Sequence, residues 1–163
     1  MLIIICGLPG SGKTTLSELV AKRFSAVHIS SDRIRKQVLS NIVYSEDEKR
    51  DVYARLSAEV EHAMKAGNNV VADATFYRKS YRSTMSDIAK RAGTKSYIIL
   101  CVAGDDEIRQ RLAGRKGGAS DADYEVYLKV KSTFEPVSED HLEINCSMDA
   151  AEIIKKIEAF TGV

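Results

Sequence analysis

The stretch Gly7–Thr14 constrains the fold of this chain more than any other part of its sequence. It reads GLPGSGKT and matches the pattern G-x-x-x-x-G-K-[ST] at every fixed position. Glycines in such a loop let backbone N–H groups surround phosphate oxygens, and the following helix points its positive end at the same anion. The apolar run Leu2–Cys6 precedes the loop, and a helical stripe that begins at Leu16 follows it. This context favours a phosphate-binding loop (P-loop) over the alternative, a glycine-rich turn without a ligand.

Short apolar runs alternate with helical patterns along the chain. Runs rich in Ile and Val, which are typical of buried parallel strands, occur at Leu2–Cys6, Val27–Ile29, Val70–Ala72, Tyr97–Val102 and Leu142–Ile144. Because strands that alternate with helices form a parallel sheet covered on both faces, we expect an α/β fold with a five-stranded parallel sheet and a small lid. Binding sites in such sheets lie at the carboxyl ends of the strands.

Chain length and helix-start signals add to this expectation. The 163 residues fit one domain, 1–163, with the lid at about 114–134. Ser45 and Glu48 have the spacing of a capping box, so a long helix is expected to begin there. Ser147 is the expected cap of the last helix.

Composition and cysteine content restrict the partners and the location. The 24 basic and 23 acidic residues give a net charge of +1, so no global field draws the chain to nucleic acid or to a membrane. Cys6 and Cys101 lie in apolar runs and are interpreted as small buried hydrophobes, and the odd, widely spaced set with Cys146 suits a reducing compartment. The apolar start is too short for a membrane span and lacks the charged region of a signal peptide, so we expect a cytoplasmic location.

The P-loop pattern predicts the residues that bind a nucleotide and its metal. Lys13 is expected to reach the β- and γ-phosphates, and the Thr14 hydroxyl to bind Mg²⁺, so ATP and Mg²⁺ are the expected cofactors. The loop residues expected to contact the nucleotide are Gly7, Leu8, Pro9, Gly10, Ser11, Gly12, Lys13, Thr14 and Thr15. The sequence carries neither D-x-x-G nor N-K-x-D, the motifs of GTPase switches. Ala74 follows Asp73 where a motor ATPase usually carries a second acidic residue, which leaves a small phosphotransferase that must hold an acceptor and exclude water.

Asp32 and Arg35 follow the second expected strand and lie one helical turn apart. A carboxylate at Asp32 would face the γ-phosphate across the crevice and accept a proton from an attacking hydroxyl. Arg35 would hold an anionic group of the acceptor by bidentate hydrogen bonds. The alternative is that Asp32 merely caps the helix, but the P-loop upstream favours the catalytic interpretation.

Asp73 follows the third expected strand and is placed to hold Mg²⁺ through water. Arg78 and Arg82 then lie four residues apart on one helix face that begins at the crevice, so they are candidates for binding acceptor phosphates. A solvated charged face with ordinary ion pairs is an equally weighted alternative. Phe76 and Tyr77 are candidates for stacking on a base, with core packing as their alternative.

A basic segment that runs into glycines predicts the lid. Arg111 and Arg115 share a helix face and are expected to point at the nucleotide, and a lid arginine would stabilise charge on the transferring phosphoryl group. Arg109 points elsewhere and is expected at the surface. A flexible connector is the alternative for Gly117–Ala119, and 121–134 would be the return helix.

Together these motifs resemble those of the small P-loop kinases of the polynucleotide 5′-kinase type and related AAA-type small kinases. The resemblance runs from Met1 to about Pro136 and rests on GLPGSGKTT, SDRIR, VVADAT with Arg82, RLAGR and FEP. It implies that Asp32 is the general base, that Arg35 contacts an acceptor phosphate, and that Arg111 and Arg115 lie near the donor nucleotide and its phosphates. The chain reads Asp73-Ala74-Thr75 where the family often reads D-T-N, which points toward related kinases of small molecules.

The sequence therefore predicts an ATP- and Mg²⁺-dependent phosphotransferase that acts on a hydroxyl acceptor. The expected catalytic residues are Lys13, Asp32, Arg35 and Arg115, and the expected acceptor-binding residues are Asp32, Arg35, Arg78 and Arg82. The leading acceptor is the 5′-hydroxyl of a nucleic acid. One alternative is the hydroxyl of a small metabolite such as a nucleoside, sugar or antibiotic, and another is a module that binds ATP without transferring phosphate.

Overall fold

The computed structural model describes residues 1–38, 45–114 and 124–163, and its centre is one parallel sheet. The strands run in the order β2-β3-β1-β4-β5, and each neighbouring pair is parallel. Their bounds are β1 (Leu2–Cys6), β2 (Val27–Ser30), β3 (Val70–Asp73), β4 (Ser96–Val102) and β5 (His141–Asn145). The predicted α/β fold with a five-stranded parallel sheet is confirmed.

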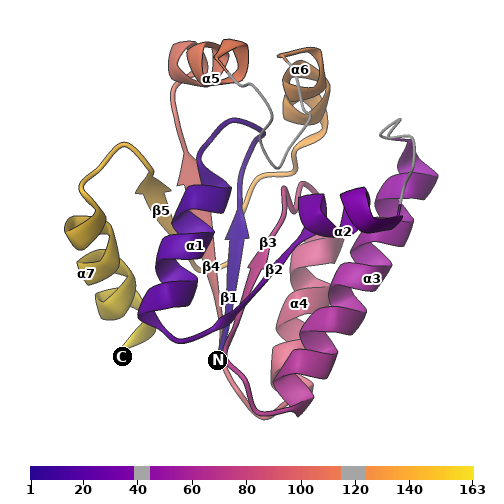
Figure 1. Ribbon diagram of the computed structural model, residues 1–163, viewed down its shortest axis with the longest axis vertical. Helices are drawn as coiled ribbons and strands as arrows, with labels where there is room; N and C mark the ends of the chain where they lie inside the picture. The colour runs from indigo at the N-terminus through magenta and orange to yellow at the C-terminus, as the bar shows by residue number, and fades with distance from the viewer. Residues whose placement is uncertain (39–44, 115–123) are drawn as a thin grey trace.

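Helices cover both faces of the sheet, as Figure 1 shows. On one face lie α1 (Lys13–Arg23) and α7 (Ala150–Thr161); on the other lie α2 (Ser31–Val38), α3 (Glu46–Lys65) and α4 (Lys79–Arg91). The remaining helices, α5 (Asp105–Ala113) and α6 (Tyr124–Thr133), stand over the carboxyl ends of the strands. Along β1, Leu2 and Ile4 pack into one core and Ile3 and Ile5 into the other, because successive side chains of a strand point to opposite faces.

The strand register brings three segments together at the carboxyl edge of the sheet. Ser30 of β2 is paired with Asp73 of β3, and Asp73 is paired with Ile5 of β1. The Gly7 N–H then donates to the Thr75 carbonyl at 3.3 Å. The P-loop and the ends of β2 and β3 therefore meet at one place.

Two of the predicted helix starts had different outcomes. The Glu48 N–H donates to the Ser45 hydroxyl at 3.2 Å, so Ser45 caps α3 as predicted. The prediction that Ser147 caps the last helix was wrong, because Asp149 accepts from the Ala151 N–H at 2.9 Å and caps α7.

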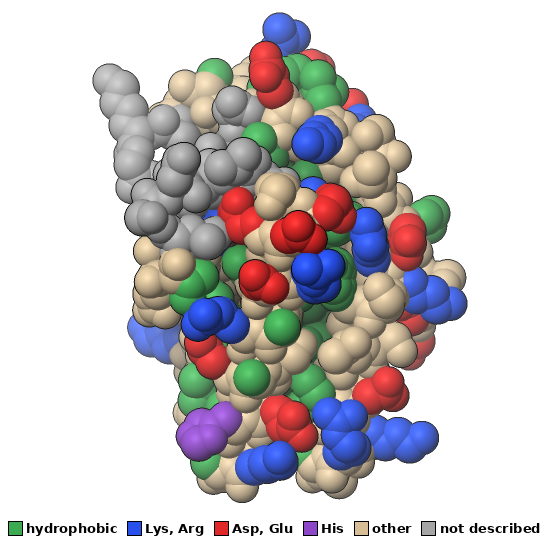
Figure 2. Space-filling view, turned by 90° about the vertical axis from the view of Figure 1, so that its right-hand side faces the viewer, with side chains coloured by type: hydrophobic (Ala, Val, Ile, Leu, Met, Phe, Trp, Pro, Cys, Tyr) green, Lys and Arg blue, Asp and Glu red, His purple; other side chains and the backbone are tan. Residues whose placement is uncertain are grey.

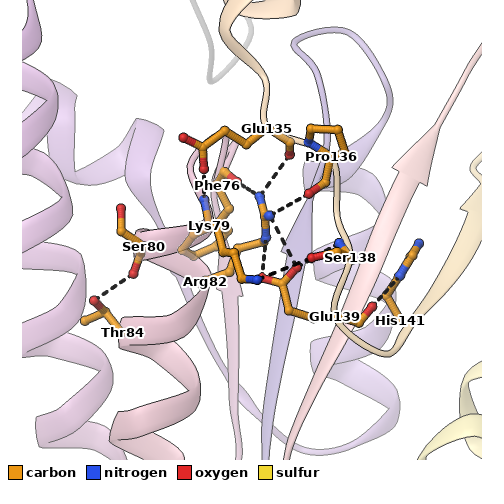
Figure 3. Close-up of polar contacts among 10 residues, drawn as sticks. All are labelled: Phe76, Lys79, Ser80, Arg82, Thr84, Glu135, Pro136, Ser138, Glu139 and His141. Atoms are coloured by element: carbon orange, nitrogen blue, oxygen red, sulfur yellow. Dashed lines mark hydrogen bonds and ion pairs between the residues drawn. The ribbon is translucent and has the colours of Figure 1, made fainter.

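The Arg82 side chain is completely buried, and this corrects its assignment to acceptor binding. Its guanidinium donates to the carbonyls of Phe76 (2.9 Å), Glu135 (3.3 Å) and Pro136 (3.0 Å) and forms two contacts with the Glu139 carboxylate, at 3.0 and 3.3 Å. Figure 3 shows these groups converging on one guanidinium. Arg82 thus fixes the segment between α6 and β5 against the start of α4 and has no access to an acceptor.

Cys101 and Cys146 form a disulfide, which the sequence interpretation missed. Cys101 lies near the end of β4, and Cys146 lies just after β5. These two strands are neighbours, and their register pairs Cys101 with Ile144. Cys6 is a free, buried thiol, as expected for a small hydrophobe. Among the described residues, no helix is both long enough and apolar enough to cross a bilayer.

Candidate active site

The P-loop owes its shape to glycines with positive φ angles. Gly7, Gly10 and Gly12 have φ angles of 143°, 82° and 102°, which L side chains rarely adopt. A Cβ atom on Gly7 would lie 2.4 Å from the Cys101 carbonyl oxygen, so the loop also packs too closely against β4 for a side chain. Lys13, the first residue of α1, donates from Nζ to the Leu8 carbonyl at 2.9 Å, which places its ammonium across the loop.

Replacing Gly7 with alanine should weaken ATP binding about tenfold or more. The new methyl group must push the loop away from β4 and adopt a strained φ, and a cost above about 1.4 kcal/mol is tenfold in affinity. Gly93→Ala is the matched control, because Gly93 also has a positive φ, at 67°, but nothing lies within 4 Å of its Cβ position. Calorimetric titration with ATP checks this, and equal affinities in the two variants would contradict it.

A cavity of about 830 Å³, including open solvent at its mouth, joins the P-loop to the ends of β2 and β3. Of the predicted site residues, those that line it are Pro9, Gly10, Gly12, Lys13, Thr14, Thr15, Asp32, Arg35 and Asp73. The fold therefore brings the expected phosphate, base and metal positions to one cavity.

Asp32 and Arg35 are held together in the first turns of α2. Arg35 Nη1 donates to Asp32 Oδ1 at 3.1 Å, and Arg35 Nε lies 3.2 Å from Glu48 Oε1 of α3. The side chains of Arg35 and Glu48 are 9% and 7% exposed, whereas that of Asp32 is 26% exposed. Arg35 thus bridges two carboxylates and fixes Asp32 at the cavity wall.

Asp73 and Thr14 are the candidate ligands for Mg²⁺. Both line the cavity, and their carboxylate and hydroxyl oxygens are the donor types that Mg²⁺ prefers alongside water and phosphate. Asp73 Oδ2 lies 3.3 Å from His28 Nε2, and both side chains are less than 10% exposed. His28 therefore orients this carboxylate. The donor set fits Mg²⁺ held partly by the protein and partly by a nucleotide.

Two other arginines predicted to bind the nucleotide or the acceptor, Arg78 and Arg111, are not among the described residues that line the cavity. Arg111 Nη1 donates to the Gly10 and Ser11 carbonyls at 3.4 and 3.1 Å, so it contacts the P-loop backbone. Arg78 forms an ion pair of 2.8 Å with Glu46 and is 47% exposed. Arg115 and the rest of 115–123 in the predicted lid lie outside the described residues, and the return helix is described from Tyr124 onward as α6.

Sequence reasoning missed part of the cavity wall. Lys49 and Tyr53 lie one turn apart on α3 and line the cavity opposite Val126 and Val130 of α6. Tyr77, a stacking candidate, lines the cavity, whereas Phe76 is completely buried in the core. Burial raises the pKa of Tyr53 well above its usual range, so its hydroxyl stays protonated. The spacing of four residues indicates that Lys49 and Tyr53 share one helix face. The sequence does not indicate that this face lies next to the P-loop.

The fold of this chain is shared by solved structures of P-loop kinases. A sugar kinase from Janibacter sp. HTCC2649 superimposes with a TM-score of 0.76 at 15% identity, over 99% of this chain and 94% of that one. An APS kinase of Mycobacterium tuberculosis, solved with AMPPNP and APS, gives 0.74 at 16% identity, over 99% and 97%. These likenesses show that the chain has the P-loop kinase fold.

Residues 2–137 match the family described as AAA domain, and the chain belongs to that family. An uncharacterized protein of Mycobacterium bovis is 30% identical in an alignment 139 residues long, which covers 77% of this chain. This chain spans only 28% of that relative's length.

Proposed function

We propose that this protein transfers the γ-phosphate of ATP to a hydroxyl group of a small molecule. The observation that carries the proposal is one continuous cavity, lined by Lys13 and Thr14 at the P-loop and by Asp32 on α2. A kinase needs its donor phosphate and its general base to meet within one space that admits an acceptor and limits water. The small-molecule kinases that share the fold support the same class of reaction.

Each part of the proposed reaction is assigned to particular residues of the cavity and the P-loop. The acceptor oxygen attacks the γ-phosphorus, the bond to the β–γ bridging oxygen breaks, and ADP leaves while Asp32 takes the hydroxyl proton. Lys13 and the P-loop N–H groups bind the β- and γ-phosphates, and Arg35 keeps Asp32 in place from 3.1 Å. When bound by Thr14 and Asp73, Mg²⁺ neutralises charge on the phosphates.

The cation arrangement favours a small acceptor over the nucleic acid 5′ end. A strand-binding groove needs cations free to meet backbone phosphates. Arg82 is buried in a structural role, and Arg78 is paired with Glu46. Figure 2 shows acidic and basic side chains interspersed on the face formed by α3 and α4, where ion pairs such as Arg50–Asp47 and Lys65–Glu61 lie.

Charge balance at the acceptor end of the cavity supports an uncharged, hydroxyl-bearing molecule such as a nucleoside or sugar. Arg35 lies between Asp32 and Glu48, and Lys49 Nζ lies 2.7 Å from Glu46 Oε1. Tyr77, which Lys49 approaches at 5.2 Å from the ring centre, offers an apolar surface beside these groups. Rings with hydroxyl groups match such a mixture of apolar and hydrogen-bonding surface.

Phosphate transfer from γ-labelled ATP with Mg²⁺ tests the acceptor class. The panel contains a 5′-hydroxyl oligonucleotide, nucleosides and neutral sugars, with GTP as a second donor. We expect label on a nucleoside or sugar and none on the oligonucleotide. Label on the oligonucleotide would instead support the hypothesis that the acceptor is a nucleic acid 5′-hydroxyl, which the order of the sequence motifs favours. ATP binding without transfer to any acceptor would favour a nucleotide-sensing module.

A further inference from the structure

The Cys101–Cys146 pair packs against the P-loop. The two Cα atoms are 6.6 Å apart, within the range that a disulfide spans. Cys101 is 2% exposed, whereas Cys146 is partly exposed and can be reached from solvent. The third cysteine, Cys6, belongs to the core on the opposite side of the sheet, and burial raises the pKa of its thiol to about 12. A small oxidant therefore has one accessible thiol with one partner beside it.

Both cysteines contact the loop that would hold the nucleotide. Cys101 Sγ lies 3.2 Å from the Ser11 carbonyl oxygen, a distance at which a thiol donates a hydrogen bond to it. A Cβ atom on Gly12 would lie only 2.7 Å from Cys146 Cβ, so the loop packs tightly on that residue. Arg111 joins the same unit, because it donates to the Ser11 carbonyl at 3.1 Å and to the Ser147 hydroxyl at 3.0 Å.

The hydrogen bond and the disulfide exclude each other. A reduced Cys101 carries the S–H that donates to Ser11, whereas a disulfide sulfur has no hydrogen to donate. Oxidation therefore removes the hydrogen bond that Cys101 donates to the Ser11 carbonyl of the P-loop. It also links Cys101 in β4 covalently to Cys146 in the turn after β5. Reduction restores the donor and releases the turn.

We propose that Cys101 and Cys146 form a reversible oxidation site that adjusts nucleotide affinity. With a peroxide as oxidant, the Cys146 sulfur attacks one oxygen, the O–O bond breaks, and a sulfenic acid and one water form. The Cys101 sulfur then displaces the second oxygen as water and completes the S–S bond. The two sulfurs are oxidised, the two peroxide oxygens are reduced, and the two thiol protons leave in water. A dithiol reverses the process by exchange.

Oxidation should weaken ATP binding about two- to tenfold, the worth of one hydrogen bond of ordinary strength. Oxidation is expected to change the affinity for ATP, the phosphate donor. This affinity depends on the P-loop and not on which acceptor the protein phosphorylates. A binding measurement therefore tests the inference even if no acceptor is phosphorylated.

The experiment compares the full chain after treatment with hydrogen peroxide and after treatment with dithiothreitol. Alkylation under denaturing conditions followed by intact mass counts the free thiols, and titration with a fluorescent ATP analogue gives the affinity. We expect three free thiols in the reduced protein, one in the oxidised protein, and weaker binding in the latter. Cys6→Ala, the matched control, should retain the whole response, and Cys146→Ser should lose it.

Three results would overturn the inference. Peroxide treatment leaves three alkylated thiols; or the disulfide forms with unchanged ATP affinity; or Cys146→Ser responds to peroxide as the wild type does. Cys146 is partly exposed, so its replacement should fold, which the thermal unfolding curve of the variant verifies. If Cys146→Ser does not fold, Cys146→Ala takes its place under the same criteria.

Discussion

Replacing Asp32 with asparagine should lower the rate of phosphate transfer by about 10²- to 10⁴-fold, the usual contribution of a positioned general base. The side chain keeps its size and its contact with Arg35, which donates to Oδ1 from 3.1 Å, but it can no longer take the hydroxyl proton. ATP affinity should remain close to that of the wild type, because the P-loop and Lys13 are untouched. Steady-state transfer assays and ATP titration measure the two quantities separately.

Asp51→Asn is the matched control for this change. Asp51 is an exposed aspartate on α3 and does not line the cavity, so its replacement should leave the rate unchanged. A near-normal rate in Asp32→Asn would remove Asp32 from the role of base. Loss of ATP binding together with activity would instead make Asp32 part of the nucleotide site.

Arg82→Met should destabilise the fold by about 3–5 kcal/mol, the cost of breaking a buried ion pair by removing one partner. The change removes the Arg82 guanidinium, which is completely buried, from three carbonyls and from the Glu139 carboxylate, to which the Ser138 N–H also donates. For a chain of this length the melting temperature should fall by roughly 6–20 °C. Thermal unfolding followed by circular dichroism measures the shift.

Arg78→Met is the control for Arg82→Met, because it removes a neighbouring arginine whose side chain is 47% exposed. Its ion pair with Glu46 lies at the surface, where such pairs contribute about 0–1 kcal/mol. Equal stability of the two variants would contradict the structural role of Arg82. Preserved stability with selective loss of acceptor affinity in Arg82→Met would return Arg82 to acceptor binding.

The stability difference between the wild type and Arg82→Met should depend on pH. Burial tends to raise the pKa of Glu139, but the hydrogen bonds and charge of Arg82, together with hydrogen bonds from the Ser138 and Glu139 backbone, outweigh it and hold the pKa below its ordinary value of 4.5. A carboxylate with a lowered pKa stabilises the fold at pH values above its unfolded pKa, and this contribution is lost as the pH falls through the folded pKa. The difference should therefore narrow below about pH 4.5.

The sheet and the P-loop could be predicted because their signals are local. Apolar runs mark the strands, and the motif between Leu2–Cys6 and α1 fixes the loop. The strand ends were harder: Ser30 and Asp73 belong to β2 and β3 although they are polar, because backbone pairing with neighbouring strands extends to them. Ser45 was identified as a cap because its partner, Glu48, lies three residues away.

Contacts between distant residues could not be predicted from one sequence. The spacing of Arg78 and Arg82 indicates a shared helix face but not which of the two is buried, and the partner of Arg82, Glu139, lies 57 residues further along the chain. The same holds for Cys101 and Cys146, which lie 45 residues apart and meet only because β4 and β5 are neighbours. His28 on β2 likewise contacts Asp73 on the neighbouring strand β3, 45 residues further along the chain.

Transfer of phosphate to a small hydroxyl-bearing molecule is tested most directly by phosphorus NMR of ATP, Mg²⁺ and the acceptor identified in the labelling panel. We expect a new phosphomonoester resonance that grows in step with ADP in the wild type and is almost absent in Asp32→Asn. ADP that accumulates with inorganic phosphate, and no phosphomonoester, would show a hydrolase and contradict it.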